Sequence, residues 1–481
     1  MSQRYFRLAV LSAATVVALS ACSLAPRYER PAAPVPAQFP QFSPSSAAAT
    51  AAPAVAASDL GWREFFRDPR LLALINVALE NNRDLRVAAG RVQEARAQYG
   101  IQQSDRVPTL GIGGNAQIQH NPDNLLANSG ASNVSRYYQA GIGSTAFELD
   151  FFGRVKNLTE AAYQQYLSTE QARRTVHLTL VAQVAEAYFS LRTAQQRQVL
   201  VQKTLQSYQD TYDLVKRRYD SGVAGALDLS QAKAQLDTAS ADLQSTRRAL
   251  EQAHNLLQLL LGQAPPPNLP AAAPFSTKQL MAAVPAGLPS DLLTRRPDII
   301  GAENTLEAAN ANVGAARAAF FPNISITGLL GFASPALGGL FSSSQRFWSF
   351  SPQLTVPIFS GGISGNLDLA KARKNIAVSQ YEKTIQTAFR EVADALAGEA
   401  TYTGQLEALQ SLESTSRNTL KLAQLRYDAG IDSFLQVQTA EIALYSAQQQ
   451  LLQVRLNALS NRVELYKALG GGWLADSNRG S

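Results

Sequence analysis

The chain has 481 residues, of which 46% are hydrophobic and 17% are charged, and its formal net charge is +6. A single cysteine excludes a disulfide framework and a cysteine-built zinc cluster within one chain, and three scattered histidines argue against a histidine-built metal site. Basic and acidic residues are interleaved along the chain. We therefore expect no nucleic-acid partner, because such partners require clustered positive charge.

The N-terminus has the pattern of a bacterial signal peptide. Arg4 and Arg7 precede a short apolar stretch, residues 8–19, which cannot span a bilayer as a helix. The sequence Leu19-Ser20-Ala21-Cys22 then resembles a lipobox, in which the cysteine is acylated and becomes the first residue of the mature chain. We expect a signal peptide over 1–21 and lipidation of Cys22. The alternative is an ordinary signal peptide with an incidental cysteine.

The residue after the cysteine indicates the membrane to which the lipoprotein is sorted. Under the sorting rule that the lipobox resemblance implies, an aspartate here retains a lipoprotein at the inner membrane, whereas Ser23 indicates the outer membrane. After the signal peptide, no apolar stretch approaches the roughly 18 residues of a membrane-spanning helix. If the mature chain crosses a membrane, it must do so as a closed β-barrel, because lipid does not tolerate open strand edges.

Comparison of the two halves shows an internal repeat. The residues from Asp84 to Pro108 recur 214 positions later, from Asp298 to Pro322, with a glycine at the matching positions 100 and 314. Arg218-Tyr219-Asp220-Ser221-Gly222 recurs as Arg426-Tyr427-Asp428-Ala429-Gly430, 208 positions later. We infer a duplicated unit: repeat 1 over 61–262, an equatorial linker over 263–297, and repeat 2 over 298–470. A lipidated extended tether over 22–60 precedes them, and a tail over 471–481 follows.

Both repeats predict the same elements in chain order. Repeat 1 begins with a helix at about 68–105, continues with strands at about 108–120 and 138–150, and ends with helices at about 157–219 and 226–261. Repeat 2 has the corresponding helix at about 298–320, strands at about 322–332 and 347–359, and helices at about 365–427 and 434–469.

The strand segments alternate between apolar and polar residues, which is typical of strands with one apolar face. Such segments fit the wall of a transmembrane barrel, although alternation alone also fits a soluble antiparallel sheet. Alternation fails near Ala146 and Phe147, which predicts a bulge. Because small membrane barrels need about eight strands, four strands per chain imply either an intermolecular barrel or strands outside the membrane.

The helices predict antiparallel packing. Both shorter helices carry a seam of apolar residues at three- and four-residue spacing, with alanine at many positions, so that neighbouring helices can approach closely. In the second repeat the seam residues are Val437, Ala440, Leu444, Ala447, Leu451, Val454, Ala458, Asn461, Leu465 and Ala468. Two isolated coiled-coil hairpins would explain these seams but not the strands.

Several motifs together resemble the TolC family of outer-membrane efflux channels, in its OprM/NodT-like lipoprotein branch. They are the lipobox, Gly61-Trp62, Phe151-Phe152-Gly153-Arg154, Arg295-Arg296-Pro297-Asp298-Ile299, Arg426-Tyr427-Asp428-Ala429-Gly430 and Gly470-Gly471-Gly472-Trp473. The resemblance implies an α+β membrane protein that forms a homotrimer. Four strands from each chain complete a twelve-stranded outer-membrane β-barrel, which continues as a periplasmic antiparallel coiled-coil α-helical tunnel.

The resemblance also implies a function. The channel passively conducts substrates, drugs or other small toxic compounds among them, to the exterior from a periplasmic membrane-fusion adaptor and a proton-driven inner-membrane pump. It needs no cofactor beyond the covalent lipid on Cys22. The expected location is the outer membrane, with the lipid-anchored chain extending into the periplasm.

The implied functional residues lie at the turns that follow the two long helices. Adaptor docking is expected at Tyr219, Asp220, Gly222, Val223, Tyr427, Asp428, Gly430 and Ile431. Gly222 and Gly430 also fit the left-handed residue that commonly ends a helix.

The periplasmic gate is expected at Leu435, Gln436, Thr439, Asp228 and Asp432. Family members commonly carry an aspartate ring where this chain has Gln436 and Thr439, so we expect an apolar constriction at Leu435 and weaker cation preference. The alternative role for Leu435 is packing in the helical seam.

Three other functions compete with small-molecule efflux. A type I protein-secretion duct would share the same fold. A structural coiled-coil lipoprotein would explain the seams and the anchor, but not the duplicated strand pairs. An enzyme would need a catalytic constellation, and neither a nucleophile elbow nor a phosphate-binding loop is present in the sequence.

Overall fold

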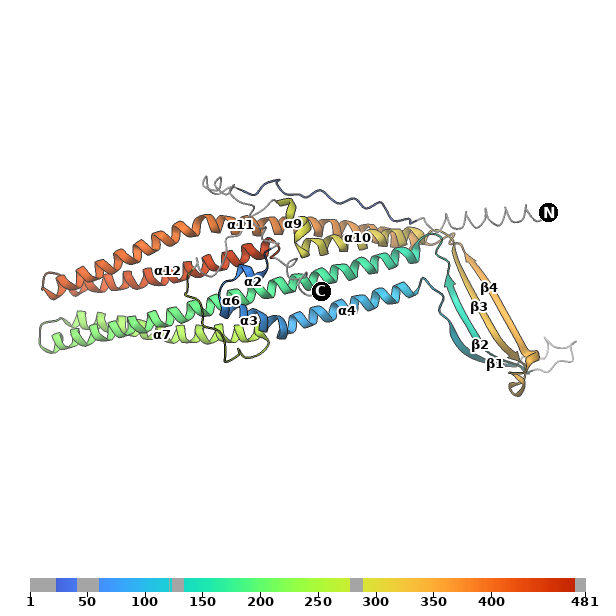
Figure 1. Cartoon of the computed structure of the whole chain (residues 1–481), viewed down its shortest axis with the longest axis horizontal. Helices are drawn as coiled ribbons and strands as arrows, with labels where there is room; N and C mark the ends of the chain where they lie inside the picture. Colours follow the sequence, from blue (N-terminus) through green and yellow to red (C-terminus); the bar gives the residue numbers. More distant parts are fainter. Residues whose placement is uncertain (1–22, 41–59, 121, 123–133, 277–288, 472–481) are drawn as a thin grey trace. The chain divides into compact units, whose positions relative to one another are not determined.

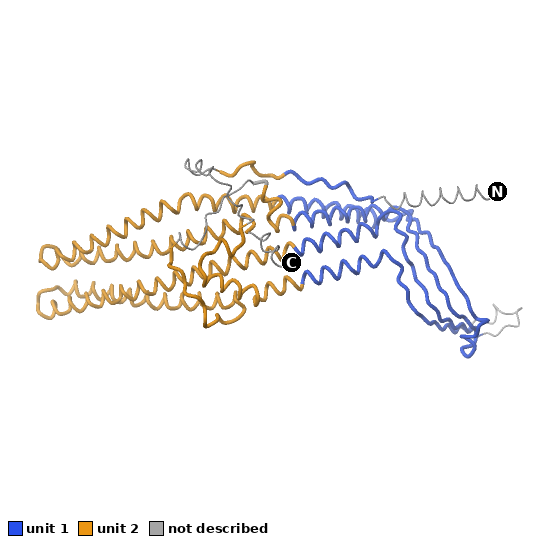
Figure 2. Tube along the Cα trace, in the orientation of Figure 1, with its two compact units in different colours: residues 1–32, 91–170, 301–382 blue, residues 33–90, 171–300, 383–481 orange. Residues whose placement is uncertain are grey.

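The computed structural model describes residues 23–40, 60–120, 122, 134–276 and 289–471. The chain divides into two compact units, coloured separately in Figure 2. Unit 1 comprises residues 1–32, 91–170 and 301–382, and unit 2 comprises residues 33–90, 171–300 and 383–481.

Figure 1 shows the helices and strands; in each half of the chain, helices precede two strands, which a long helix and a shorter helix follow. The first half contains α2 (Trp62–Phe65), α3 (Pro69–Asn81), α4 (Arg83–Ser104), β1 (Gly111–His120), β2 (Val134–Glu148), α6 (Arg154–Asp220) and α7 (Ala226–Leu261). The second half contains α9 (Pro289–Arg295), α10 (Pro297–Ala318), β3 (Asn323–Ser334), β4 (Arg346–Thr355), α11 (Gly361–Asp428) and α12 (Phe434–Ala468). Two 3₁₀ turns, Leu337–Gly339 and Ser343–Gln345, lie between β3 and β4.

Unit 1 contains one antiparallel sheet in which the four described strands follow the order β1-β2-β3-β4. The predicted bulge in the second strand is confirmed, because the pairing between β2 and β3 shifts between Ser144 and Phe147. Ala146 lies in this shift with a φ of 54°, and its N–H donates to the hydroxyl of Thr327 rather than to a backbone carbonyl. An extra residue at a bulge is left out of the ladder in this way.

The sheet leaves large apolar side chains uncovered within one chain. Trp348 on β4 is 75% exposed, and Ile112 on β1 and Leu330 on β3 are also exposed. A soluble protein would normally bury such a face against a second layer. The exposed side chains indicate that the sheet meets another apolar environment.

The described helices include none that is both long enough and apolar enough to cross a membrane.

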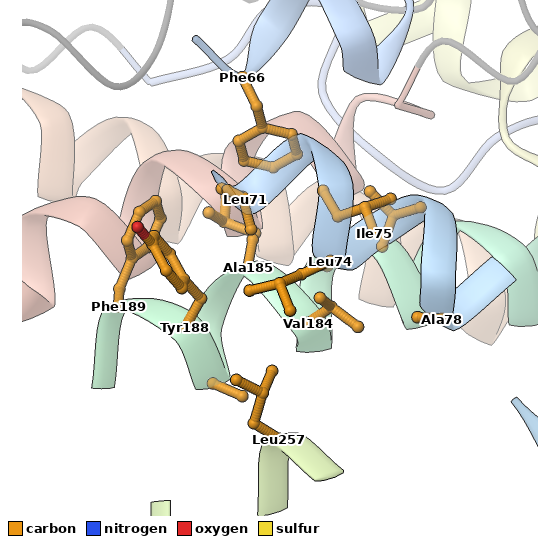
Figure 3. Close-up of a cluster of buried hydrophobic side chains, with 14 of the residues drawn as sticks. Phe66, Leu71, Leu74, Ile75, Ala78, Val184, Ala185, Tyr188, Phe189 and Leu257 are labelled. Carbon is orange, nitrogen blue, oxygen red and sulfur yellow. The ribbon is translucent and has the colours of Figure 1, made fainter. Parts of the chain in front are cut away.

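Unit 2 is organised around a hydrophobic core in which α3 packs against α6 and α7 (Figure 3). Leu71, Leu74 and Ile75 of α3 are fully buried, as are Val184 and Phe189 of α6. These α3 residues recur at three- and four-residue spacing, so they share one face of the helix. Asp68 begins α3 by accepting the N–H of Arg70, and its second carboxylate oxygen accepts the Tyr188 hydroxyl.

The prediction of one continuous helix over 68–105 is wrong, because the chain breaks at Asn82. This residue has an extended ψ of 134°. Its side-chain oxygen accepts the N–H of Leu85 at the start of α4, and its side-chain N–H donates to the carbonyl of Leu260 at the end of α7. Asn82 thus caps one helix and holds another, which offsets the backbone hydrogen bonds lost at the break.

The predicted seam of the last helix is confirmed. Of the ten seam residues expected in α12, all except Leu444 are buried. The motif at the start of the second repeat has a structural role in the same unit. Buried Arg296 donates to the carboxylates of Asp298 and Glu391 and to the carbonyl of Ala468, which joins α10, α11 and α12.

Candidate functional site

The two long helices, α6 and α11, end within unit 2 in turns of the same design. After α6, the N–H of Gly222 donates to the carbonyl of Tyr219 and the N–H of Val223 donates to that of Arg218. After α11, Gly430 and Ile431 make the matching bonds to Tyr427 and Arg426. This pair of bonds is a Schellman motif, which needs a left-handed residue. The predicted left-handed glycines are confirmed, with φ values of 75° at Gly222 and 71° at Gly430.

The turns differ in their charged side chains. Arg426 donates two hydrogen bonds to Asp432, at 2.6 and 3.0 Å, within the second turn. Alanine occupies the position corresponding to Asp432 in the first repeat, Ala224. The guanidinium of Arg218 instead lies 4.6 Å from the centroid of the Tyr427 ring, a cation–π contact between the two hairpins.

A small apolar cluster also joins the hairpins beside these turns. Val215 of α6, Ala232 of α7, and Phe434 and Val437 of α12 are buried against one another. Figure 1 shows both turns at the same end of the helices. The structure therefore brings the expected docking residues of the two repeats together at one end of unit 2.

The expected gate residues fall into two groups. Leu435 is 51% exposed, and Gln436 and Thr439 are exposed beside it on α12. The Thr439 hydroxyl donates to the carbonyl of Leu435, so it is satisfied within its own helix. The alternative role of Leu435, packing in the helical seam, does not hold within one chain. Phe434 and Val437 occupy the buried face of α12 instead.

The two acidic candidates make local bonds. Asp228 accepts the N–H of Gly225 at 3.3 Å and so caps the start of α7. Asp432 is paired with Arg426, and this partner lowers the pKa of its carboxyl group. Both carboxylates therefore help to shape the turns that they occupy.

Sequence reasoning missed Glu441, which is only 5% exposed. Its Oε1 accepts the Thr211 hydroxyl at 3.4 Å, while Oε2 has no hydrogen-bond partner among the described residues. Burial raises the pKa of this carboxyl from 4.5 to about 7, against the smaller opposing effect of the Thr211 bond. The available signal was its position four residues after Val437 and seven after Phe434, on the buried face of α12.

Glu441 borders a cavity of about 570 Å³ within unit 2. The cavity is lined by α6, α11 and α12, with Lys203, Arg417 and Arg455 as its basic residues and Glu413 and Glu441 as its acidic residues. Glu413 pairs with Arg417 on the same helix and accepts from Gln448 of α12. Glu441 is thus a buried carboxyl beside a polar cavity, six residues after Leu435 and two residues after Thr439 on α12.

The predicted lipidation site, Cys22, lies outside the described residues, which begin at Ser23.

Comparison with known proteins identifies the family. Residues 74–263 and 288–471 match the family described as outer membrane efflux protein. The antibiotic efflux pump outer membrane protein ArpC of Pseudomonas putida is 47% identical over 465 residues, which are 96% of this chain and 95% of the relative. The toluene efflux pump outer membrane protein TtgC of Pseudomonas putida has the same identity and shares.

A solved structure agrees with these relatives. The open state of the outer membrane channel MtrE of Neisseria gonorrhoeae superposes with a TM-score of 0.83 at 39% identity, covering 94% of this chain and 98% of that one.

The chain is therefore an outer-membrane efflux channel protein. It belongs to the outer membrane efflux protein family, which confirms the resemblance to TolC-family channels. Members of this family are channels and not enzymes, so the enzymatic alternative is excluded.

Proposed function

We propose that this protein is the exit duct of a tripartite efflux system that expels small toxic compounds. A periplasmic adaptor and a proton-driven inner-membrane pump deliver the substrate, and the channel conducts it passively to the exterior. One observation carries this proposal: the chain matches, over 96% of its length, relatives named for antibiotic and toluene efflux. Protein secretion through the same duct is the alternative function.

Export in cells lacking their own channel tests the proposal. The chain is expressed with the adaptor and pump of the ArpC system in a strain without its outer-membrane component. We expect restored antibiotic resistance and lower accumulation of a fluorescent dye. Matched cells with an inactive pump are the control. Resistance that stays at the control level, together with export of a type I secretion substrate, would replace efflux by protein secretion.

The channel itself is proposed to be a homotrimer. In the described sheet, β1 and β4 are edge strands, each paired on one side only. Edge strands expose unpaired N–H and C=O groups, which are costly in lipid. Three chains joined through these edges would form a twelve-stranded barrel, and the exposed Trp348 and Ile112 fit a wall in contact with apolar surroundings.

The two halves of each chain are proposed to derive from one duplicated unit, repeat 1 over 61–262 and repeat 2 over 298–470. The identical order of helix, two strands, long helix and shorter helix in the two halves supports this origin. The linker 263–297, with the chain termini, is proposed to form a belt around the helices. Acylation of Cys22 anchors each chain to the outer membrane, since two or more acyl chains give stable anchoring.

Leu435 is the proposed gate residue at the periplasmic end. Its support is the exposed side chain on a helix whose opposite face is buried. Gln436 and Thr439 lie on the same exposed side, and Asp228 and Asp432 shape the adjacent turns. An apolar constriction without an acidic ring would favour cations less than acidic gates do. The turn residues Tyr219, Asp220, Gly222, Val223, Tyr427, Asp428, Gly430 and Ile431 are the proposed adaptor contacts.

Single-channel conductance in planar bilayers tests the gate. We expect Leu435→Ala to raise the closed-state conductance, because the substitution removes apolar bulk from the constriction. The matched control is Leu227→Ala, the corresponding exposed leucine of the first repeat, which should leave the conductance unchanged. A closed state that Leu435→Ala does not alter would remove Leu435 from the gate.

A further inference from the structure

The cavity that α6, α11 and α12 line in unit 2, here called the groove, is long as well as large. On α12 its lining begins at Glu441 and reaches Arg455, 14 positions later, which corresponds to about 21 Å at roughly 1.5 Å per residue. Its volume of about 570 Å³ lies within the range of roughly 300–1,000 Å³ that is usual for sites of small organic ligands. The groove therefore has room for an elongated organic molecule.

Leucine side chains from all three helices form the apolar part of the groove. They are Leu200 of α6, Leu420 of α11, and Leu444, Leu451 and Leu452 of α12. Leu451 is buried, whereas the other four remain partly exposed. Removing such surface from water is favourable, so the leucines offer a contact surface to the apolar body of a ligand.

The charged side chains of the groove carry an excess of positive charge. Burial raises the pKa of Glu413, but hydrogen bonds from Gln448 and Arg417 and the charge of Arg455 together lower it, so this carboxyl group is ionised and has two arginine neighbours. Lys203 lines the groove from α6 as a third cation. Among the described residues, neither Lys203 nor Arg455 makes a hydrogen bond or an ion pair. One ionised carboxylate thus serves three cations, and a concave site of this kind attracts anions.

Two of the cations lie at a similar height along the helices. Neighbouring glutamines of α12 bond to Glu413 of α11 and to Arg197 of α6, so these two residues are level with each other. Lys203 follows Arg197 by six positions, about 9 Å along α6, and Arg417 follows Glu413 by four positions, about 6 Å along α11. Both helices run toward the turns at the same end of unit 2, so the two displacements have the same direction (Figure 1). Lys203 and Arg417 therefore flank the groove at nearly one level.

Glu441 adds a hydrogen-bonding group to the wall of the groove. Its Oε2 is buried and has no hydrogen-bond partner among the described residues, whereas buried polar groups normally have one. Burial keeps this carboxyl protonated up to about pH 7, and a protonated carboxyl donates one hydrogen bond. In that form Glu441 adds no negative charge to the groove and can donate to a polar atom of a ligand.

We propose that the groove between α6, α11 and α12 is a binding site for an amphipathic organic anion. The negative group lies between Lys203 and Arg417, while Arg455 continues to balance Glu413. The apolar body lies along the leucines. This site is separate from the proposed gate residue Leu435 and from the turn residues, and it does not depend on which cargo the channel exports. A neutral molecule of the same shape gains only the apolar contacts and binds more weakly.

Two dyes that differ in a single sulfonate test the role of charge. Anilinonaphthalene sulfonate is a permanent anion, phenylnaphthylamine has the same aromatic body without the sulfonate, and both fluoresce more strongly outside water. Each is titrated at pH 6 into the full-length protein in phosphatidylcholine nanodiscs, with empty nanodiscs as the blank. We expect the parent protein to bind the anion more tightly. No binding above the blank, or equal affinity for the two dyes, would overturn the proposal.

Substitutions of the two cations test the site itself. We expect Lys203→Gln and Arg417→Gln each to weaken binding of the anionic dye about fivefold, as the loss of one charge contact in a solvated site would, and to leave the neutral dye nearly unchanged. Lys216→Gln and Arg390→Gln, exposed cations outside the groove on the same two helices, are the matched controls and should behave as the parent. Unchanged affinity for the anion in the groove variants, or an equal loss for both dyes, would contradict charge recognition.

A bulky side chain in the groove tests the location independently of charge. Ser207 lines the groove from α6 and is exposed, so Ser207→Phe can enter the cavity without disturbing the buried core. We expect this variant to weaken binding of both dyes. Both affinities at the parent values would place the dyes elsewhere on the protein and refute the proposed site.

Discussion

At the scale of single residues, Glu441 is expected to make the stability of the protein depend on pH. Its carboxyl is buried with one unpartnered oxygen, and its folded-state pKa of about 7 lies above the ordinary 4.5. Below pH 4.5 the group is neutral in both the folded and unfolded states. As the pH rises through this window, the unfolded chain ionises first, and stability falls until Glu441 itself ionises near pH 7.

Replacing the Glu441 carboxyl by an amide should remove this loss of stability at high pH. We expect Glu441→Gln to stabilise each chain by up to about 3 kcal/mol at pH 8 and to have little effect at pH 4.5. Thermal unfolding of the detergent-solubilised protein, followed by circular dichroism from pH 4 to 8, measures the difference. A gain in melting temperature that is the same at every pH would contradict the role assigned to ionisation.

Glu413, which lines the same cavity, provides a control, because its ionisation should change stability in the opposite direction. Burial raises the pKa of its carboxyl, but hydrogen bonds from Gln448 and Arg417 outweigh that effect and lower the pKa below 4.5. Its contribution to stability is therefore present above pH 4.5 and is lost as the pH falls through the lowered pKa. Glu413→Gln should destabilise the protein at pH 7, with an effect that shrinks in acid.

At the scale of helices, the close approach of α11 and α12 depends on one glycine. A Cβ at Gly398 would lie 2.1 Å from the side-chain oxygen of Asn461, a buried seam residue that donates to the carbonyl of Ala395 at 2.9 Å. A polar residue in such a seam sets the register of two helices. The sequence marked Asn461 as a seam residue, but its partner became visible only once both helices were placed.

Replacing glycine by alanine usually stabilises a helix, but at position 398 it should destabilise the protein. Gly398→Ala must displace Asn461 and break its bond, a loss of about 1–3 kcal/mol that exceeds the roughly 1 kcal/mol of helix propensity gained. Gly404→Ala in the same helix, where a Cβ meets nothing within 4 Å, should stabilise instead. Melting temperatures that move in the same direction for both variants would refute the packing argument.

The sequence predicted elements well wherever the cause is local. The alternation of apolar and polar residues predicted the four strands, and its loss near Ala146 predicted the bulge. The repeated Arg-Tyr-Asp motifs predicted both glycine turns. The sequence failed at Asn82, whose partner Leu260 is 178 positions away, and it did not show the partner of Glu441, Thr211 of α6. Both failures involve polar residues whose partners come from distant segments, and no local periodicity reports such partners.

At the scale of the whole molecule, the proposed trimer would join through strands β1 and β4, the two edges of the described sheet. In detergent, the purified protein should have three times the mass of one chain by native mass spectrometry. The neighbouring chain supplies the backbone partners that edge strands lack, so a lone chain would leave these groups unpaired in lipid. A mass equal to one chain would contradict the proposal.

Cysteine cross-linking identifies the strands that meet. Gln117 of β1 is combined in turn with Ser349, Ser351 and Gln353 of β4, each replaced by cysteine; all four lie on the polar side of their strands. Because facing residues fall in one register, we expect one pair to give covalent dimers and trimers far more efficiently than the others. The control places the first cysteine at Gln139 of β2, which already pairs with Asn115 and Ala333 inside the chain. Since an interior strand has no free edge, this control should yield no product between chains. Products of equal yield from Gln117 and Gln139 would mean that the chains do not join edge to edge.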